Sequence, residues 1–136
     1  MTSYAADINK LMLFLSELRE ISSTMQAQQA MCLLSVAVAP GLTASDMSRV
    51  TGLGLSSISR NVNALSRWNR HGEAGYDLVE QVDDPVEPRR KIFFLNQRGR
   101  AKLQKIITIL RSDEAIIFDS PTAAEAVERS HRHARR

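Results

Sequence analysis

The chain has 136 residues, 43% of them hydrophobic and only 5% aromatic, with a formal net charge of +3. Its single cysteine excludes an internal disulfide and a cysteine-based metal cluster, and no apolar run approaches the ~20 residues of a membrane-spanning helix. We expect one globular domain, cytoplasmic and without a membrane partner. The positive charge lies mid-chain: residues 56–111 hold 11 basic and 6 acidic side chains, against 3 and 4 in residues 1–55. Such clustering is typical of proteins that bind a polyanion.

The first half of the chain predicts three helices. Residues 5–20 and 25–39 carry apolar side chains at helical spacing, and Pro40 with Gly41 ends the second. A capping box follows, in which Thr43 accepts from the amide of Asp46 and the carboxylate reaches back. The helix that it starts is short, because glycines at 52 and 54 close it by about residue 51.

A fourth helix is predicted over residues 56–70, with Ser56 as its N-cap. Ile58, Val62 and Leu65 recur on one face and fasten the helix to the body of the domain. No residue of this segment is acidic. The opposite face is expected to consist of small or flexible polar and basic side chains, namely Ser57, Ser59, Arg60, Asn61, Asn63 and Arg67.

After a connection at residues 71–75, the pattern predicts strands at 76–82 and 91–95. The stretch that joins them, DDPVEPRRK at 83–91, places acids first and bases last around two prolines. Asn96 is expected to cap a long last helix with an apolar stripe, and residues 113–136 to form a short helix or a basic tail.

A short helix, a tight turn and a second helix followed by a hairpin form a winged helix-turn-helix. The major groove admits one helix, where arginine can contact guanine and asparagine can contact adenine. The alternative is that the polar face is merely solvated. Against it, serine and asparagine are mediocre helix formers, whereas a solvated face more often uses glutamate or lysine.

Two segments together resemble the MarR-type winged-helix transcription regulators: TASDMSRVTGLGLSSISRNVNALSRW and LVEQVDDPVEPRRKIFFLNQRGRAKL. DPVEPRR at residues 84–90 is similar to the family's Asp-Pro-x-acid-x-Arg pattern at the hairpin tip, and LNQRG at 95–99 to its Leu-Thr-x-x-Gly, with asparagine as the cap. The join at residues 70–76 is longer than is usual in the family. The resemblance implies a mainly α fold with a small β-hairpin wing, and a homodimer held by helices from both chain ends.

The resemblance also implies the site residues. The helix from Ser56 would enter the major groove, and the wing would lie at the minor groove or the DNA backbone. One wing acid is expected to brace an arginine; Asp84 with Arg90 is the candidate pair, which leaves Arg89 to project, although the reverse assignment stays open. The full set is Ser56, Ser57, Ser59, Arg60, Asn61, Asn63 and Arg67 on the helix, Arg89, Arg90, Lys91 and the bracing Asp84 in the wing, and Thr43 and Ser45 near the DNA backbone.

The sequence therefore predicts a DNA-binding domain over residues 1–112 of a homodimeric, nucleoid-associated transcription repressor that binds specific double-stranded DNA. No phosphate-binding loop or clustered metal ligands are present, so we expect no enzyme activity, cofactor or metal. A small-molecule effector is possible in such a family, but no residue indicates one. Two other functions stay open: a non-regulatory DNA-binding accessory factor, of the replication or phage type, and a protein–protein adaptor.

Overall fold

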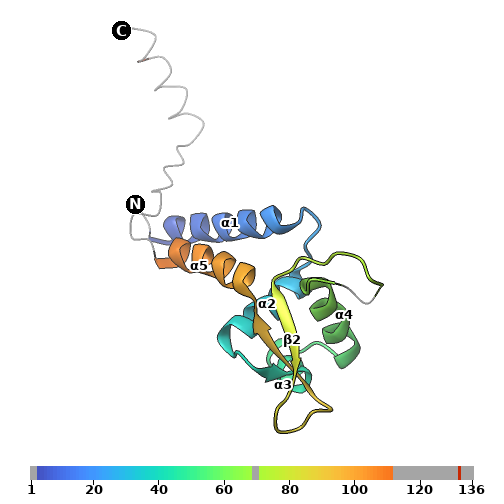
Figure 1. Cartoon of the computed structure of the whole chain (residues 1–136). Coiled ribbons are helices and arrows are strands. Elements are labelled where there is room, and N and C mark those ends of the chain that lie inside the picture. The colour runs from blue at the N-terminus through green and yellow to red at the C-terminus, as the bar shows by residue number, and fades with distance from the viewer. Residues whose placement is uncertain (1–2, 69–70, 112–131, 133–136) are drawn as a thin grey trace.

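A computed structural model describes residues 3–68, 71–111 and 132 of the chain. The described residues form a mainly helical fold with one small sheet, which confirms the predicted fold class (Figure 1). The expected tail at residues 113–136 lies outside the described residues, apart from Arg132. The elements are α1 (Ser3–Ile21), α2 (Ala27–Val38), β1 (Leu42–Thr43), α3 (Ala44–Thr51), α4 (Leu55–Leu65), β2 (Val79–Asp83), β3 (Lys91–Leu95) and α5 (Gln97–Arg111).

The fold has two parts. Helices α1 and α5 lie side by side and form an arm, while α2, α3, α4 and the sheet form a body below it (Figure 1). The two helices of the arm are joined by Lys102 on α5, which contacts Glu17 at 2.8 Å and Glu20 at 3.1 Å on α1. Because Lys102 and Glu17 are each only 15% exposed, this cluster is a partly buried ionic contact.

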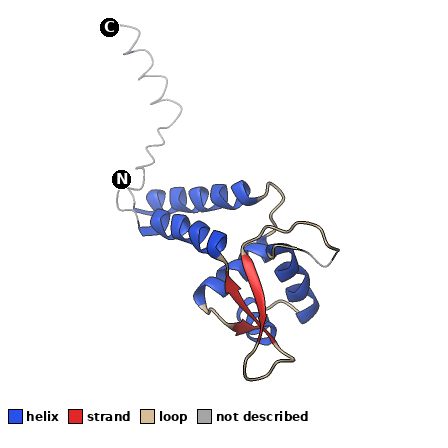
Figure 2. Ribbon diagram, in the orientation of Figure 1, coloured by secondary structure: helices blue, strands red, loops and turns tan. Residues whose placement is uncertain are grey.

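The sheet is antiparallel with the order β1–β3–β2 (Figure 2). Strands β2 and β3 form the hairpin, paired from Val79 with Leu95 to Asp83 with Lys91, and we call residues 79–95 the wing. The predicted second strand is confirmed. The predicted first strand is wrong at its start, because residues 76–78 bond to the end of α4 instead of to β3. Strand β1 has only two residues, too few for a periodic signal.

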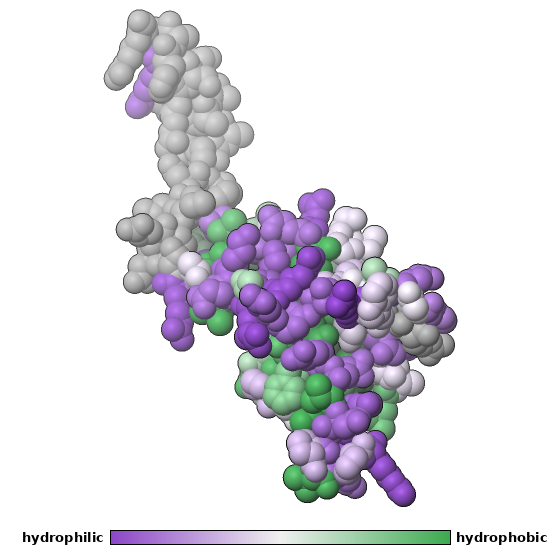
Figure 3. Space-filling view, viewed as in Figure 1, coloured by the Kyte–Doolittle hydropathy of each residue, from purple (hydrophilic) through white to green (hydrophobic). Residues whose placement is uncertain are grey.

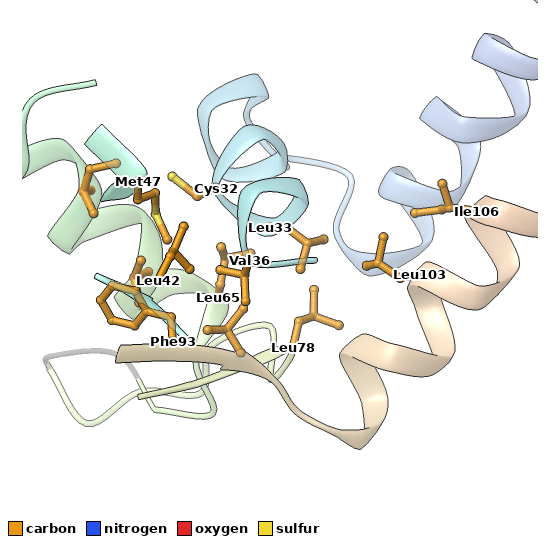
Figure 4. Close-up of a cluster of buried hydrophobic side chains, with 13 residues drawn as sticks. Cys32, Leu33, Val36, Leu42, Met47, Leu65, Leu78, Phe93, Leu103 and Ile106 are labelled. Atoms are coloured by element: carbon orange, nitrogen blue, oxygen red, sulfur yellow. The ribbon is translucent and has the colours of Figure 1, made fainter. Parts of the chain in front are cut away.

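The hydrophobic core lies where α2, α3, α4 and the sheet converge (Figure 4). Leu33, Met47, Ile58 and Leu65 are fully buried there, at 0% exposure. The core extends towards the arm through Leu103 and Ile106 of α5, so the body and the arm share one core. Burial of apolar area at ~25 cal/mol per Å² is the main favourable contribution to such a fold.

The turn between α3 and α4 follows the local chemistry of the sequence. The predicted capping box is confirmed, because the Thr43 hydroxyl accepts from the Asp46 amide and the Asp46 carboxylate accepts from the Thr43 amide, both at 3.1 Å. Gly52 ends α3 with φ = 76°, a conformation that other residues adopt at a cost. The N-cap of α4 is Gly54 and not Ser56 as predicted, since the Gly54 carbonyl accepts the first helical bond, from Ile58.

Helix α4 ends at Leu65, five residues before the predicted end at residue 70. The cause is a segment far along the chain: the amides of residues 75–78 donate to the carbonyls of Arg67, Ala64, Ser66 and Leu65, at 2.8–3.2 Å. These bonds satisfy carbonyls that further helical turns would otherwise use. The backbone approach is close, because a Cβ on Gly75 would lie 2.0 Å from the Ser66 carbonyl oxygen, so no larger residue fits.

Candidate nucleic-acid interface

Helix α4 has a buried face and an exposed face. Ile58, Val62 and Leu65 pack into the core, as predicted. On the other side, four polar residues recur at spacings of three, four and seven, which places them in one line along the helix. We call them the outer stripe: Ser56, Ser59 and Arg60, which are exposed, and Asn63, which is partly exposed.

Asn61 is a correction to the predicted site. It was expected on the groove-facing side, but it is 6% exposed and lies on the buried face of α4. The reason is helical geometry, since residue 61 follows Ile58 by three positions and so shares its face. Its Nδ2 atom is buried and has no hydrogen-bond partner among the described residues. Asn61 therefore cannot contact a base without disrupting the core.

Two further predicted residues lie beside the outer stripe. Ser57 is partly buried, and its hydroxyl contacts the Gln28 side chain of α2 at 3.3 Å. Arg67 lies two residues beyond the end of α4, and its guanidinium carbon lies 5.8 Å from the centre of the Trp68 ring. Trp68 is itself 59% exposed. Arg67 thus belongs to the connection after the helix and is not in line with the outer stripe.

The tip of the wing is held by Asp84. Its carboxylate accepts from the Val86 amide at 2.9 Å and from two nitrogens of Arg90, at 2.9 and 2.6 Å. The backbone closes the same turn, because the Asp84 amide donates to the Arg90 carbonyl and the Arg90 amide to the Glu87 carbonyl. The Val86 amide and then the Arg90 guanidinium hold the pKa of the Asp84 carboxyl below its ordinary value.

The structure thus has Arg90, and not Arg89, on Asp84. Arg89 is exposed and makes no ion pair with any residue of the described ranges. Lys91 is paired with Asp83 at the base of the turn. Hydrophobic and hydrophilic surface adjoin at the tip (Figure 3), where Val86 is 88% exposed. Among the described residues, Arg89 is therefore the cation of the wing that has no acidic partner.

The N-terminus of α3 lies between α4 and the wing. A cleft there is lined by Thr43, Ser45, Ser59, Gln81 and Arg90, among others. The Thr43 hydroxyl is occupied by the Asp46 amide, whereas Ser45 is exposed. The cleft therefore brings the outer stripe, the start of α3 and the wing onto one side of the molecule.

Sequence reasoning missed one residue of this region, Gln81 of β2. Its Nε2 atom contacts Asn63 Oδ1 and Ser66 Oγ, both at 3.2 Å, and so joins the wing to α4. Strand alternation is the signal that could have found it, because Gln81 lies two residues from the buried Val79 and shares its face. A glutamine on that inward face needs a polar partner.

Among the described residues, no group of three or more histidine, cysteine, aspartate or glutamate side chains could hold a metal ion. Within the same ranges no helix has both the length and the apolar character needed to cross a membrane.

Comparison with known proteins gives the fold. No protein-family model and no curated protein matches the sequence. Solved structures do match. A MarR family transcription regulator is 21% identical, with 87% of this chain and 71% of that chain covered and a TM-score of 0.55.

Two further structures have known sources. Apo MarR from E. coli is 19% identical, with 97% and 91% covered and a TM-score of 0.56. BpsR from Bordetella bronchiseptica, described with regulation of its DNA binding by 6-hydroxynicotinic acid, is 17% identical, with 96% and 86% covered and a TM-score of 0.53. The chain has the winged-helix fold of the MarR family transcription regulators.

Proposed function

We propose that the chain is a sequence-specific double-stranded DNA-binding protein that regulates transcription as a homodimer. The observation that carries the proposal is the outer stripe of α4, an acid-free line of polar and basic side chains beside a wing that presents Arg89. A helix of this kind fits the major groove, and its side chains can reach base edges. The fold that it shares with known regulators supports the same function.

Each part of the surface has a distinct role in this proposal. Arg60 contacts guanine through O6 and N7, and Asn63 contacts a neighbouring base. Arg89 reaches the minor groove or a phosphate beside it, while Arg90 keeps the tip in shape through Asp84. Ser45, with the capped start of α3 at Thr43, lies along the DNA backbone.

The arm provides the surface for the second copy. Both helices of the arm expose large apolar side chains that nothing in the described part of the monomer covers, and an exposed patch of this kind marks an interaction surface. With α1 and α5 as the dimer contacts, residues 1–112 form a DNA-binding domain with its own dimerisation elements. The exposed apolar residues of the arm are Tyr4, Ile8, Leu11, Met12, Leu15, Ile107 and Leu110.

A symmetric dimer places two copies of α4 on half-sites about one helical turn apart. Occupation of such a site in a promoter excludes polymerase, so we propose that the protein is a repressor. Two rival functions predict different results: an accessory factor binds DNA away from promoters, and an adaptor binds no DNA at all.

The test is selection of bound fragments from randomised and genomic DNA, followed by footprinting. The wild-type protein is expected to enrich a two-fold symmetric motif, and Arg60→Ala to lose ~1–3 kcal/mol on that motif with little change on random DNA. Arg19→Ala, an exposed arginine of α1, is the matched control. Equal losses on both DNAs would reduce Arg60 to a phosphate contact, and no retention of DNA at low salt would favour the adaptor.

A further inference from the structure

We propose that Gln81 of the wing is a positioning residue for specificity, because it determines which end of the Asn63 amide faces the DNA. The inference rests on the proposed function and deepens it. It starts from a chain of hydrogen bonds that links β2 to α4: Ser66 Oγ to the Val62 carbonyl at 2.8 Å, Gln81 Nε2 to Ser66 Oγ at 3.2 Å, and Gln81 Nε2 to Asn63 Oδ1 at 3.2 Å.

The direction of this chain follows from its first member. A backbone carbonyl can only accept, so the single hydroxyl proton of Ser66 is donated to Val62. The Ser66 oxygen can then only accept from Gln81, which requires the Nε2 end of Gln81 to face it. The second proton of Nε2 is directed at Asn63, whose oxygen must face Gln81, since two amino groups would present donor to donor.

Asn63 is the one asparagine on the outer stripe. With Oδ1 held by Gln81, the Nδ2 group is the end left for another partner, and no residue in the described ranges bonds to it. Asn63 therefore approaches the major groove as a hydrogen-bond donor.

A donor in the major groove discriminates against cytosine, because cytosine presents no acceptor there. Guanine accepts at O6 and N7, thymine at O4 and adenine at N7, whereas cytosine presents only its N4 donor. We therefore expect guanine, thymine or adenine, and not cytosine, at the base that Asn63 contacts. Ser66 is 8% exposed and its proton is committed to Val62, so the polarity is set inside the protein before DNA binds.

Two substitutions of Gln81 separate this role from simple packing. Gln81→Met keeps the length of the side chain but removes the donor, so the Asn63 amide is no longer held in one orientation. Gln81→Glu offers only acceptors, so Asn63 turns its Nδ2 end to residue 81 and presents Oδ1 to the DNA. The first change should weaken the base preference, and the second should invert it. The added charge lowers affinity for all sequences alike and cancels in a relative preference.

The experiment is selection from a randomised DNA library with the full chain and its variants. The position contacted by Asn63 is the one whose preference disappears in Asn63→Ala. There the wild type should disfavour cytosine, and Gln81→Met should weaken this discrimination about fivefold, the ratio for one net hydrogen bond. Gln81→Glu should reverse it and favour cytosine or adenine, whose amino groups donate, over guanine and thymine. In Asn63→Ala, adding Gln81→Met should change nothing further at that position.

Gln104→Met is the matched control, because within the described ranges the Gln104 amide forms a hydrogen bond only to Thr108 of its own helix. Thermal unfolding of each variant verifies that it is folded. If Gln81→Met is unfolded, the reversed base preference expected of Gln81→Glu still tests the role of Gln81. A wild-type motif with an Asn63 position that both Gln81 variants leave unchanged would overturn this inference alone. If the wild type enriches a motif in which no position depends on Asn63, the role of Gln81 is also overturned. If the wild type enriches no motif at all, both the role of Gln81 and the proposed function are overturned.

Discussion

Replacement of Asn61 by leucine should stabilise the protein and leave DNA recognition unchanged. The side chain is 6% exposed and its Nδ2 group is buried without a hydrogen-bond partner in the described part of the chain. The nearby polar group is the thiol of Cys32, which is fully buried. Burial raises the pKa of this thiol to about 11 and the Asn61 amide opposes the rise, so at neutral pH the amide faces a protonated thiol, a weak acceptor.

The magnitude follows from the unpaired donor. A buried polar group without a partner costs ~1–3 kcal/mol, and leucine has the same number of side-chain heavy atoms, branched at the same carbon, with no polar atom. A replacement of the same shape usually carries a packing cost below ~1.5 kcal/mol. The net expectation is a gain of about 1 kcal/mol in the free energy of unfolding, or a few degrees in Tm for a chain of this length.

The assay is urea unfolding at one protein concentration, because dimerisation makes the apparent stability depend on concentration. Asn63→Leu is the matched control: it makes the same replacement two residues along the helix, on the outer stripe, and should lose base preference without a gain in stability. An altered motif in Asn61→Leu, with stability unchanged, would refute the placement of Asn61 in the core. A loss of stability would show that the amide has a partner.

Three more outcomes are expected. Arg89→Ala should lower the slope of log affinity against log salt concentration by about one unit. Arg90→Ala should weaken binding mainly by loosening the tip of the wing. An unchanged slope in both variants would show that the wing does not contact the DNA. Because the folded pKa of Asp84 is lowered, its contribution to wing stability is complete above the ordinary aspartate pKa and is lost as the pH falls through the folded pKa, which an NMR titration of the tip amides can follow. Lys102→Met should cost ~1–3 kcal/mol in urea unfolding, because it removes the nearer cation from the partly buried Glu17 carboxylate. Lys105→Met, whose amine lies 3.9 Å from the same carboxylate, should change stability by less than ~0.5 kcal/mol.

Features set by neighbouring residues were predicted correctly from the sequence. The capping box at Thr43 and Asp46 needs only residues three apart, and the Asn96 cap of α5 likewise uses the amide of Gly99, at 2.8 Å. The second strand of the wing also matched, since its apolar run has clear limits at Lys91 and Leu95.

Features set by distant partners were not predictable in the same way. The last turn of α4 is replaced by bonds to residues 75–78, and no local pattern in residues 56–70 signals that competition. Asn61 was misplaced for a different reason: its residue type suggested the groove, while its spacing from Ile58 already indicated the core. Gln81 acts only through contacts with α4, which become visible once the sheet and helix are packed together.

The bonds between residues 75–78 and the end of α4 also bear on how this chain can change in length. Because they fasten the start of the hairpin directly to α4, the position of the wing relative to the outer stripe does not depend on how many residues separate Trp68 from Ala74. Insertions or deletions between those two positions would leave both DNA-facing elements in register. The long join of this chain is thus a site where length can vary in evolution, or where a peptide tag can be inserted, without moving either element.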